Sequence, residues 1–170
     1  MQAAQRILVT GNAGAGKTTL ARDLSERFGL PYVGLDAIVW QPGWVRTPPL
    51  QRRRLERAIA AESAWVADGV SAVLMQAADM IVFLDQPRWR CYLRVARRNR
   101  SYLWRSRPGL PEDCPELLIA PSLIRLIWRF PQHARPQILR YRESMGRFIW
   151  LRGQAECQRW LAALKPPVPR

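Results

Sequence analysis

A glycine-rich motif near the start of the chain has the residue types and spacing of a phosphate-binding loop. Gly11 is followed at the required intervals by Gly16, Lys17 and Thr18, which fits the pattern G-x-x-x-x-G-K-[ST]. The glycines let successive backbone N–H groups point into one concavity, where a triphosphate fits. The lysine then reaches the β- and γ-phosphates, and the threonine hydroxyl is a ligand of Mg²⁺. The predicted cofactors are therefore ATP and Mg²⁺, and the predicted ATP-binding residues are Gly11, Asn12, Ala13, Gly14, Ala15, Gly16, Lys17, Thr18 and Thr19.

The residues on either side of this motif predict the elements that it needs. Ile7–Thr10 is a short apolar run that indicates a buried strand, and apolar residues recur at helical spacing from Leu20 to Phe28. A helix that begins at Lys17 directs the positive end of its dipole toward the phosphates. The alternative interpretation is a glycine-rich turn that happens to carry a lysine.

Two aspartates that follow apolar runs are the next candidates for chemistry. Asp36 follows Tyr32–Leu35, and Asp68 follows Trp65–Ala67. The carboxyl ends of parallel strands are where open α/β sheets hold their ligands. We expect Asp36 to hold a phosphoryl acceptor or take its proton, with a cap or turn role as the alternative. We expect Asp68 to be a metal residue that orients the water shell of Mg²⁺.

Arginine supplies almost all of the positive charge. The chain has 25 arginines against two lysines and a net charge of +14, and 15 of the arginines lie between residues 86 and 152. Because a guanidinium binds two phosphate oxygens at once, this excess favours either nucleotide phosphates or a nucleic-acid backbone as the partner. The arginine- and proline-containing segment 99–122 is expected to form a mobile lid over the transferring phosphoryl group.

Two other groups have open interpretations. Trp40 and Trp44 lie in a predicted loop, where they can stack on a planar substrate or close the core. The arginines at positions 52–54 and 57 lie on the polar side of a helix expected over 50–63. They form either a solvated face or a site for a substrate phosphate.

Length and composition limit the class of protein. With 170 residues, the chain is expected to form a single domain with a tail over 165–170. No apolar run approaches the ~20 residues that span a bilayer, and no secretory segment stands at the start, so we expect a cytoplasmic protein without a membrane partner. The three cysteines match no zinc or redox spacing, which predicts free thiols. A single histidine, His133, argues against a histidine metal site.

The remaining pattern alternates strands with helices. Strands are expected to end near residues 10, 35, 68, 84 and 151, and Asp85 is expected to begin a turn. An apolar helical stripe over 123–128 is expected to end at Pro131, because proline interrupts a helix. Further helices are expected over 132–145 and 155–164.

This order of elements resembles the adenylate-kinase-like nucleoside and small-molecule kinases. The stretches Gly34–Trp44 (GLDAIVWQPGW) and Trp128–Pro131 (WRFP) are also similar to the bacterial DNA topology modulation proteins, which are related P-loop proteins. The resemblance covers about residues 6–164. It implies a three-layer α/β P-loop NTPase fold, with a five-stranded parallel sheet in the order 2-3-1-4-5 and an arginine-rich helical lid.

The resemblance also implies roles for individual residues. Asp36 would face the acceptor, Arg97, Arg98 and Arg105 would belong to the lid, and the turn Arg152–Gly153 would lie near the adenine. One departure concerns the segment after Gly69, which reads Gly-Val-Ser-Ala and is shorter than the Gly-Asn-Tyr-Ser segment and helix of the relatives. Either the acceptor therefore differs from theirs, or this chain binds nucleotide with reduced or no transferase activity.

The leading hypothesis is an ATP-dependent phosphotransferase that moves the γ-phosphoryl group of Mg·ATP to a small-molecule or nucleotide acceptor. Its predicted catalytic residues are Lys17, Asp36, Arg97, Arg98 and Arg105. The alternative is a nucleic-acid-binding ATPase or regulator whose arginine surface meets DNA, with salt-sensitive binding as its mark. Exposed tryptophans in the predicted loop and lid also leave room for a homodimer contact.

Overall fold

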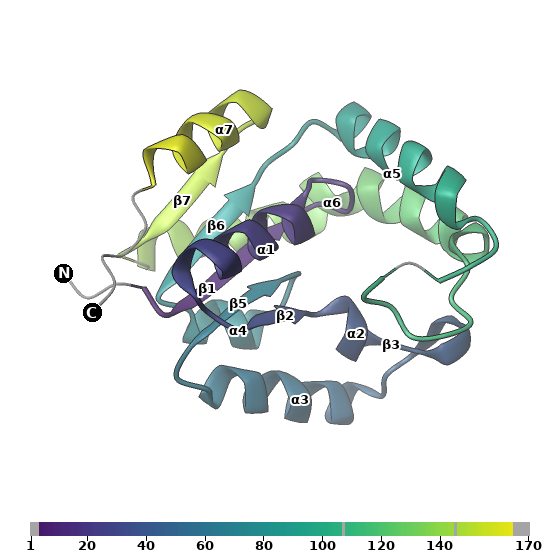
Figure 1. Cartoon of the computed structure of the whole chain (residues 1–170), viewed down its shortest axis with the longest axis horizontal. Coiled ribbons are helices and arrows are strands. Elements are labelled where there is room, and N and C mark those ends of the chain that lie inside the picture. The colour runs from purple at the N-terminus through teal and green to yellow at the C-terminus, as the bar shows by residue number, and fades with distance from the viewer. Residues whose placement is uncertain (1–3, 107, 145, 165–170) are drawn as a thin grey trace.

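A computed structural model of the chain describes residues 4–106, 108–144 and 146–164. Its central sheet has five parallel strands in the order β2-β5-β1-β6-β7 (Figure 1). Numbered among themselves along the chain, these strands have the order 2-3-1-4-5, so the predicted α/β fold and topology are confirmed. The strands are β1 (Arg6–Gly11), β2 (Tyr32–Gly34), β5 (Trp65–Asp68), β6 (Met80–Leu84) and β7 (Phe148–Leu151).

Helices cover both faces of the sheet, with α1 in front of it and α6 behind it in Figure 1. The helices are α1 (Lys17–Phe28), α2 (Asp36–Val39), α3 (Pro49–Ala61), α4 (Ala72–Ala77), α5 (Arg88–Tyr102), α6 (Glu116–Ser144) and α7 (Gln154–Ala163). The sequence did not predict a small antiparallel hairpin of β3 (Trp40–Gln41) and β4 (Val45–Arg46), joined by the 3₁₀ turn η1 (Pro42–Trp44). Strands of two residues are too short to produce a periodic pattern.

The central strands are apolar throughout because both of their faces are covered. Successive residues point to opposite faces, so Ile7 and Val9 of β1 join one core cluster and Leu8 joins the other. The first cluster includes residues of α1, α5, α6 and α7, and the second includes residues of α2, α3, α4 and α6. All five residues of β6 are buried.

The prediction that Pro131 ends a helix is wrong. Helix α6 is continuous and contains Pro121, Pro131 and Pro136. A proline has no N–H, so the carbonyl four residues earlier loses its helical partner. For Pro131 that carbonyl belongs to Ile127, and it accepts a hydrogen bond of 3.1 Å from the side-chain amide of Asn12. A contact from a distant loop thus compensates for the bond that Pro131 cannot make.

The segment predicted as a lid is mostly helical at its two ends. Residues 99–102 complete α5 and residues 116–122 begin α6, which leaves 103–115 as a connector. The indole N–H of Trp44 donates to the carbonyl of Pro115 at 2.8 Å, so the connector lies against the hairpin. The predicted tail 165–170 and the last residue of the predicted helix 132–145 lie outside the described residues.

Candidate active site

The phosphate-binding loop connects β1 to α1, and glycine is required at two positions inside it as well as at Gly11, where a Cβ would lie 2.5 Å from the carbonyl oxygen of Leu84. Gly14 and Gly16 have φ angles of 75° and 98°, in the left-handed region that other residues rarely adopt. A Cβ at Gly14 would also lie 2.6 Å from the carbonyl oxygen of Cys91 in α5. Gly16 is the N-cap of α1, so the loop ends at the positive pole of that helix, as predicted.

The side chains that follow the loop meet the predicted metal residue. The ammonium of Lys17 donates to the carbonyl of Asn12 at 2.9 Å. The hydroxyl of Thr18 donates to Oδ2 of Asp68, which ends β5 beside β1 and is only 7% exposed. Oδ1 of the same carboxylate accepts a hydrogen bond of 3.0 Å from the hydroxyl of Tyr32. Burial, reinforced by the charge of Asp68, raises the pKa of Tyr32 to about 12, so this hydroxyl is a donor at neutral pH.

A cavity of about 970 Å³ extends from the loop to the hairpin. We call its two parts the P-loop end and the hairpin end. The P-loop end is lined by Gly11, Ala13, Gly14, Gly16, Lys17, Thr18, Thr19, Asp68 and Arg94. The hairpin end is lined by Asp36, Trp40, Trp44, Arg46 and Arg52.

Two predicted loop residues do not line the cavity but support its wall. Asn12 is buried, and its side chain points to α6, where it donates to Ile127. Ala15 is buried, and its carbonyl accepts a hydrogen bond of 2.9 Å from the guanidinium of Arg94. The second N–H group of that guanidinium reaches the side chain of Gln154 at 3.1 Å, which joins α5 and α7 beside the loop.

The arginines of α5 divide between the cavity and the solvent. Arg98 lines the cavity, as the predicted lid role requires, and lies 3.3 Å from the buried carboxylate of Glu116. Arg97 is exposed and is not a lining residue. Arg105 is exposed as well and donates to the carbonyl of Ser101. The structure therefore brings one of the three predicted lid arginines to the cavity.

The turn predicted to lie near the adenine is outside the lining residues. Arg152 is exposed and stands over the ring of Trp150, 5.4 Å from its centroid, while its backbone N–H donates to Glu156. Gly153 is the N-cap of α7. The next residue, Gln154, accepts a hydrogen bond from Arg94, the arginine that also bonds to the phosphate-binding loop.

The hairpin end holds the predicted residue Asp36, three residues whose interpretation the sequence left open, Trp40, Trp44 and Arg52, and Arg46, which the sequence did not single out. Asp36 is the first residue of α2, exposed and facing the cavity. Arg52 of α3 also lines it, because its guanidinium is held by Glu56 at 2.8 Å and by the carbonyl of Val70 at 3.2 Å. The four-residue spacing of Arg52 and Glu56 is a signal in the sequence that could have distinguished Arg52 from its neighbours.

Aromatic rings close the hairpin end. Trp40 and Trp44 meet edge to face with centroids 5.2 Å apart, and the guanidinium of Arg46 lies 5.5 Å from the ring centroid of Trp40. Both tryptophans line the cavity, so the interpretation that places them beside a ligand fits the structure. Asp85, in contrast, accepts hydrogen bonds from Arg135 and Trp150, as a structural residue does.

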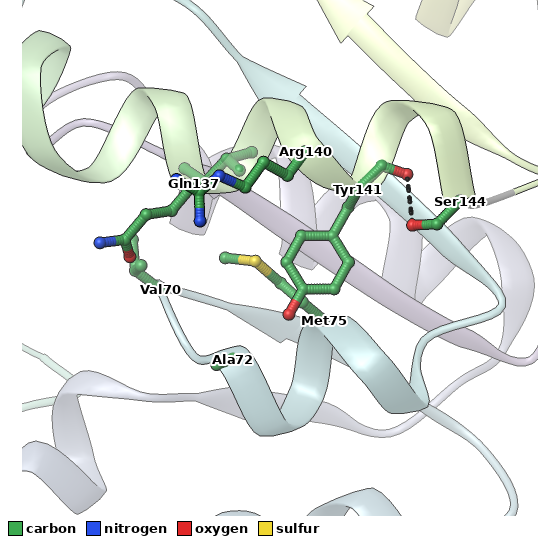
Figure 2. A pocket seen from close by; sticks show the side chains of 8 residues that line it. Val70, Ala72, Met75, Gln137, Arg140, Tyr141 and Ser144 are labelled. Atoms are coloured by element: carbon green, nitrogen blue, oxygen red, sulfur yellow. Dashed lines mark hydrogen bonds between the residues drawn. The ribbon is translucent and has the colours of Figure 1, made fainter.

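A second, smaller pocket of about 380 Å³ lies between α4 and α6. Figure 2 shows Gln137, Arg140 and Tyr141 projecting from α6 above Met75 of α4. Val70 lines both this pocket and the large cavity. The short segment after Gly69 thus forms the boundary between the two spaces.

The oxygen groups beside the loop fit Mg²⁺ bound with a nucleotide. Among residues 4–106, 108–144 and 146–164, no cluster of three or more histidine, cysteine or acidic side chains could hold a metal alone. Mg²⁺ suits such a place because it keeps several waters and takes the rest of its ligands from phosphates and one or two protein oxygens. Thr18 and Asp68 offer those oxygens.

Comparison with known proteins identifies the fold. No protein-family model and no curated protein matches the chain. Solved structures do: a shikimate kinase from Acinetobacter baumannii in complex with shikimate has 22% identity and a TM-score of 0.53 over 95% of this chain and 96% of that one. A putative kinase from Chloroflexus aurantiacus has 17% identity and a TM-score of 0.55 over 96% and 100%. A gluconokinase from Sinorhizobium meliloti has 18% identity and a TM-score of 0.51 over 93% and 91%.

The chain therefore has the fold of a P-loop kinase. None of the helices in the described part of the chain is long and apolar enough to cross a membrane.

Proposed function

We propose that the chain is an ATP-dependent phosphotransferase that acts on a small hydroxylated acceptor. The observation that carries this proposal is the shared cavity, which the P-loop residues line together with Asp36 and Arg52. A site of this kind catalyses phosphoryl transfer mainly by positioning the two reactants and neutralising charge.

The P-loop end binds the nucleotide. The backbone of Gly11–Gly16 surrounds the phosphates, and Lys17 turns from the carbonyl of Asn12 toward the γ-phosphate. Thr18 would be a ligand of Mg²⁺ and Asp68 would orient its water shell, and the bound ion would supply positive charge against the β- and γ-phosphates. Arg94 keeps the loop in place through Ala15, and Arg98 reaches the transferring group.

The hairpin end binds the acceptor. Asp36 takes the proton of the acceptor hydroxyl as its oxygen forms a bond to the γ-phosphorus. The bond from that phosphorus to the β–γ bridging oxygen breaks, and ADP leaves. The Trp40–Trp44 pair excludes water from this end.

Arg52 favours an acceptor that carries an anionic group. Its guanidinium is fixed by Glu56 and Val70 and still faces the cavity, which suits a carboxylate or phosphate on the acceptor. Shikimate, present in one structural neighbour, and the substrate that names the gluconokinase are both hydroxylated carboxylates. Compounds of that class are the first acceptors to test.

The alternative of a DNA-binding ATPase has less support. The arginines that the fold brings together, Arg46, Arg52, Arg94 and Arg98, face a concave cavity of nucleotide size. A nucleic-acid backbone requires a positively charged surface that it can reach along its length. The resemblance to DNA topology modulation proteins stays a hypothesis about family membership and does not by itself support DNA binding.

The test is phosphoryl transfer from Mg·ATP across a panel of hydroxylated carboxylates, sugars, nucleosides and nucleoside monophosphates. Lys17→Ala is the blank, and Arg27→Ala, an exposed change on the same helix, is its matched control. We expect transfer to one class of acceptor that is lost only in Lys17→Ala. Equal transfer by Lys17→Ala, or a wild-type chain that does not bind ATP, would overturn the proposal.

A further inference from the structure

Strand β2 contains a glycine that its backbone does not require. Gly34 is not among the described glycines with positive φ. Glycine weakens a strand, and it often marks the close approach of another group. A Cβ at position 34 would lie 2.9 Å from the hydroxyl oxygen of Tyr32 and 3.6 Å from Oδ1 of Asp68. The space beside Gly34 is therefore occupied by that hydroxyl.

The hydroxyl of Tyr32 is one of two donors that fix Asp68. It bonds to Oδ1 at 3.0 Å, and Thr18 donates to Oδ2. Because each oxygen has its own donor, the plane of the carboxylate is set from two sides. The ring of Tyr32 lies under the guanidinium of Arg22, which is 5.2 Å from the ring centroid and lines the same cavity.

We propose that Tyr32 is a positioning residue for the metal side of the P-loop end. Its hydroxyl holds Asp68 in the orientation that faces the water shell of Mg²⁺, and Gly34 keeps the space that this hydroxyl needs. The inference rests on the proposed function for its ATP and Mg²⁺. Tyr32 is not a lining residue of the cavity and acts through Asp68.

This role differs from simple packing in what it predicts. Groups that orient a metal-facing carboxylate typically change metal affinity about 10–100-fold when they are lost. A residue that serves only the core lowers folding stability and affects nucleotide binding equally with and without metal. The dependence of ATP binding on Mg²⁺ therefore separates the two roles.

The experiment titrates a fluorescent ATP analogue into the full chain, first with EDTA and then at increasing Mg²⁺. The variants are Tyr32→Phe, Gly34→Ala and the double variant. Tyr92→Phe is the matched control, because the hydroxyl of Tyr92 bonds to the carbonyl of Ile124, far along the chain from Asp68. Thermal unfolding of each variant accompanies the titrations.

We expect metal-free binding to be unchanged in every variant. Tyr32→Phe and Gly34→Ala should each raise the Mg²⁺ concentration for half-maximal enhancement about tenfold. The double variant should be no worse than either single one, since both remove the same hydrogen bond. Tyr92→Phe should behave as the wild type.

Two results would overturn the inference in distinguishable ways. A wild-type chain whose ATP binding does not respond to Mg²⁺ would overturn the proposed function together with this role. A wild type that responds, beside Tyr32→Phe and Gly34→Ala variants that respond equally or lose binding with and without Mg²⁺ alike, would overturn the role of Tyr32 alone.

Discussion

The P-loop end and the hairpin end of the cavity are constructed in different ways. The P-loop end consists largely of backbone between two adjoining elements, β1 and α1, with α5 pressed against it through Gly14. The hairpin end consists of side chains from α2, β3, η1, β4 and α3, two of which are two-residue strands. Phosphates need only N–H groups and charge, whereas an acceptor is recognised by particular side chains. Binding of the nucleotide phosphates and recognition of the acceptor therefore depend on two different parts of the cavity.

Loss of the lysine should have the largest effect, because it removes charge from the transferring group. Lys17→Ala should lower kcat about 100- to 1000-fold, as removal of one group that stabilises a transition state commonly does. Steady-state phosphoryl transfer measures it, with Arg27→Ala unchanged. A variant that affected only the KM of the acceptor would contradict the assignment of Lys17 to the P-loop end.

Substitution of Gly14 should disrupt the contact between the phosphate-binding loop and α5. Gly14→Ala should destabilise the fold by about 2–4 kcal/mol, since a left-handed backbone and an overlap with the carbonyl of Cys91 add together. Gly43→Ala is the control, because Gly43 has nearly the same φ, 74° against 75°, with nothing within 4 Å of the added Cβ. It should cost about 1–2 kcal/mol. Urea unfolding compares the two, and equal losses would show that the contact with α5 contributes nothing.

Removal of the Arg52 guanidinium should weaken acceptor binding at the hairpin end without affecting nucleotide binding. Arg52→Ala should raise the KM of the acceptor about tenfold or more, since a charge-assisted hydrogen bond contributes about 1.5–3 kcal/mol, and it should leave the KM of ATP unchanged. Arg53→Ala, an exposed neighbour on α3, is the control. Because Glu56 is buried and loses its partner, thermal unfolding should accompany the kinetics. A change in ATP binding equal to that in acceptor binding would remove the distinction between the two ends.

The smallest effect concerns the free thiols beside the P-loop end. Cys91 and Cys157 are free, and burial raises the pKa of each. A raised pKa lowers the thiolate fraction at a given pH, so alkylation should be slower than that of free cysteine at pH 8 and should still increase above pH 9. Mass spectrometry after timed iodoacetamide treatment measures it. Rapid modification of Cys91 in the folded chain at pH 8 would show that α5 opens from the loop.

Sequence patterns predicted the P-loop end well because its parts are consecutive. The loop, the start of α1 at Lys17, and the approach of Asp68 to Thr18 all follow from a motif and from strand ends in a parallel sheet. Arg94 was not singled out among the arginines of residues 86–152, because its contact with Ala15 joins residues that are far apart in the chain.

The hairpin end, and contacts between segments far apart in the chain, were predicted less completely, for physical reasons. Arg52 belongs to a run of three arginines, and only the buried Glu56 four residues later selects it. Tyr32 looked like a strand residue, and its contact with Asp68 depends on the pairing of β2 with β5. The continuation of α6 through Pro131 depends on a hydrogen bond from Asn12, which no local pattern contains.

Strand β7 occupies the edge of the sheet and pairs with β6 alone. It is the last strand in the part of the chain that the structure describes, so β6 has an unpaired edge until residues 148–151 are synthesised and docked. That edge belongs to Met80–Leu84, five consecutive apolar residues of high β-propensity. Exposed edges of this kind pair with other chains and aggregate. A nascent or truncated chain that lacks β7 is thus an aggregation hazard, and completion of the C-terminal strand protects the solubility of the fold.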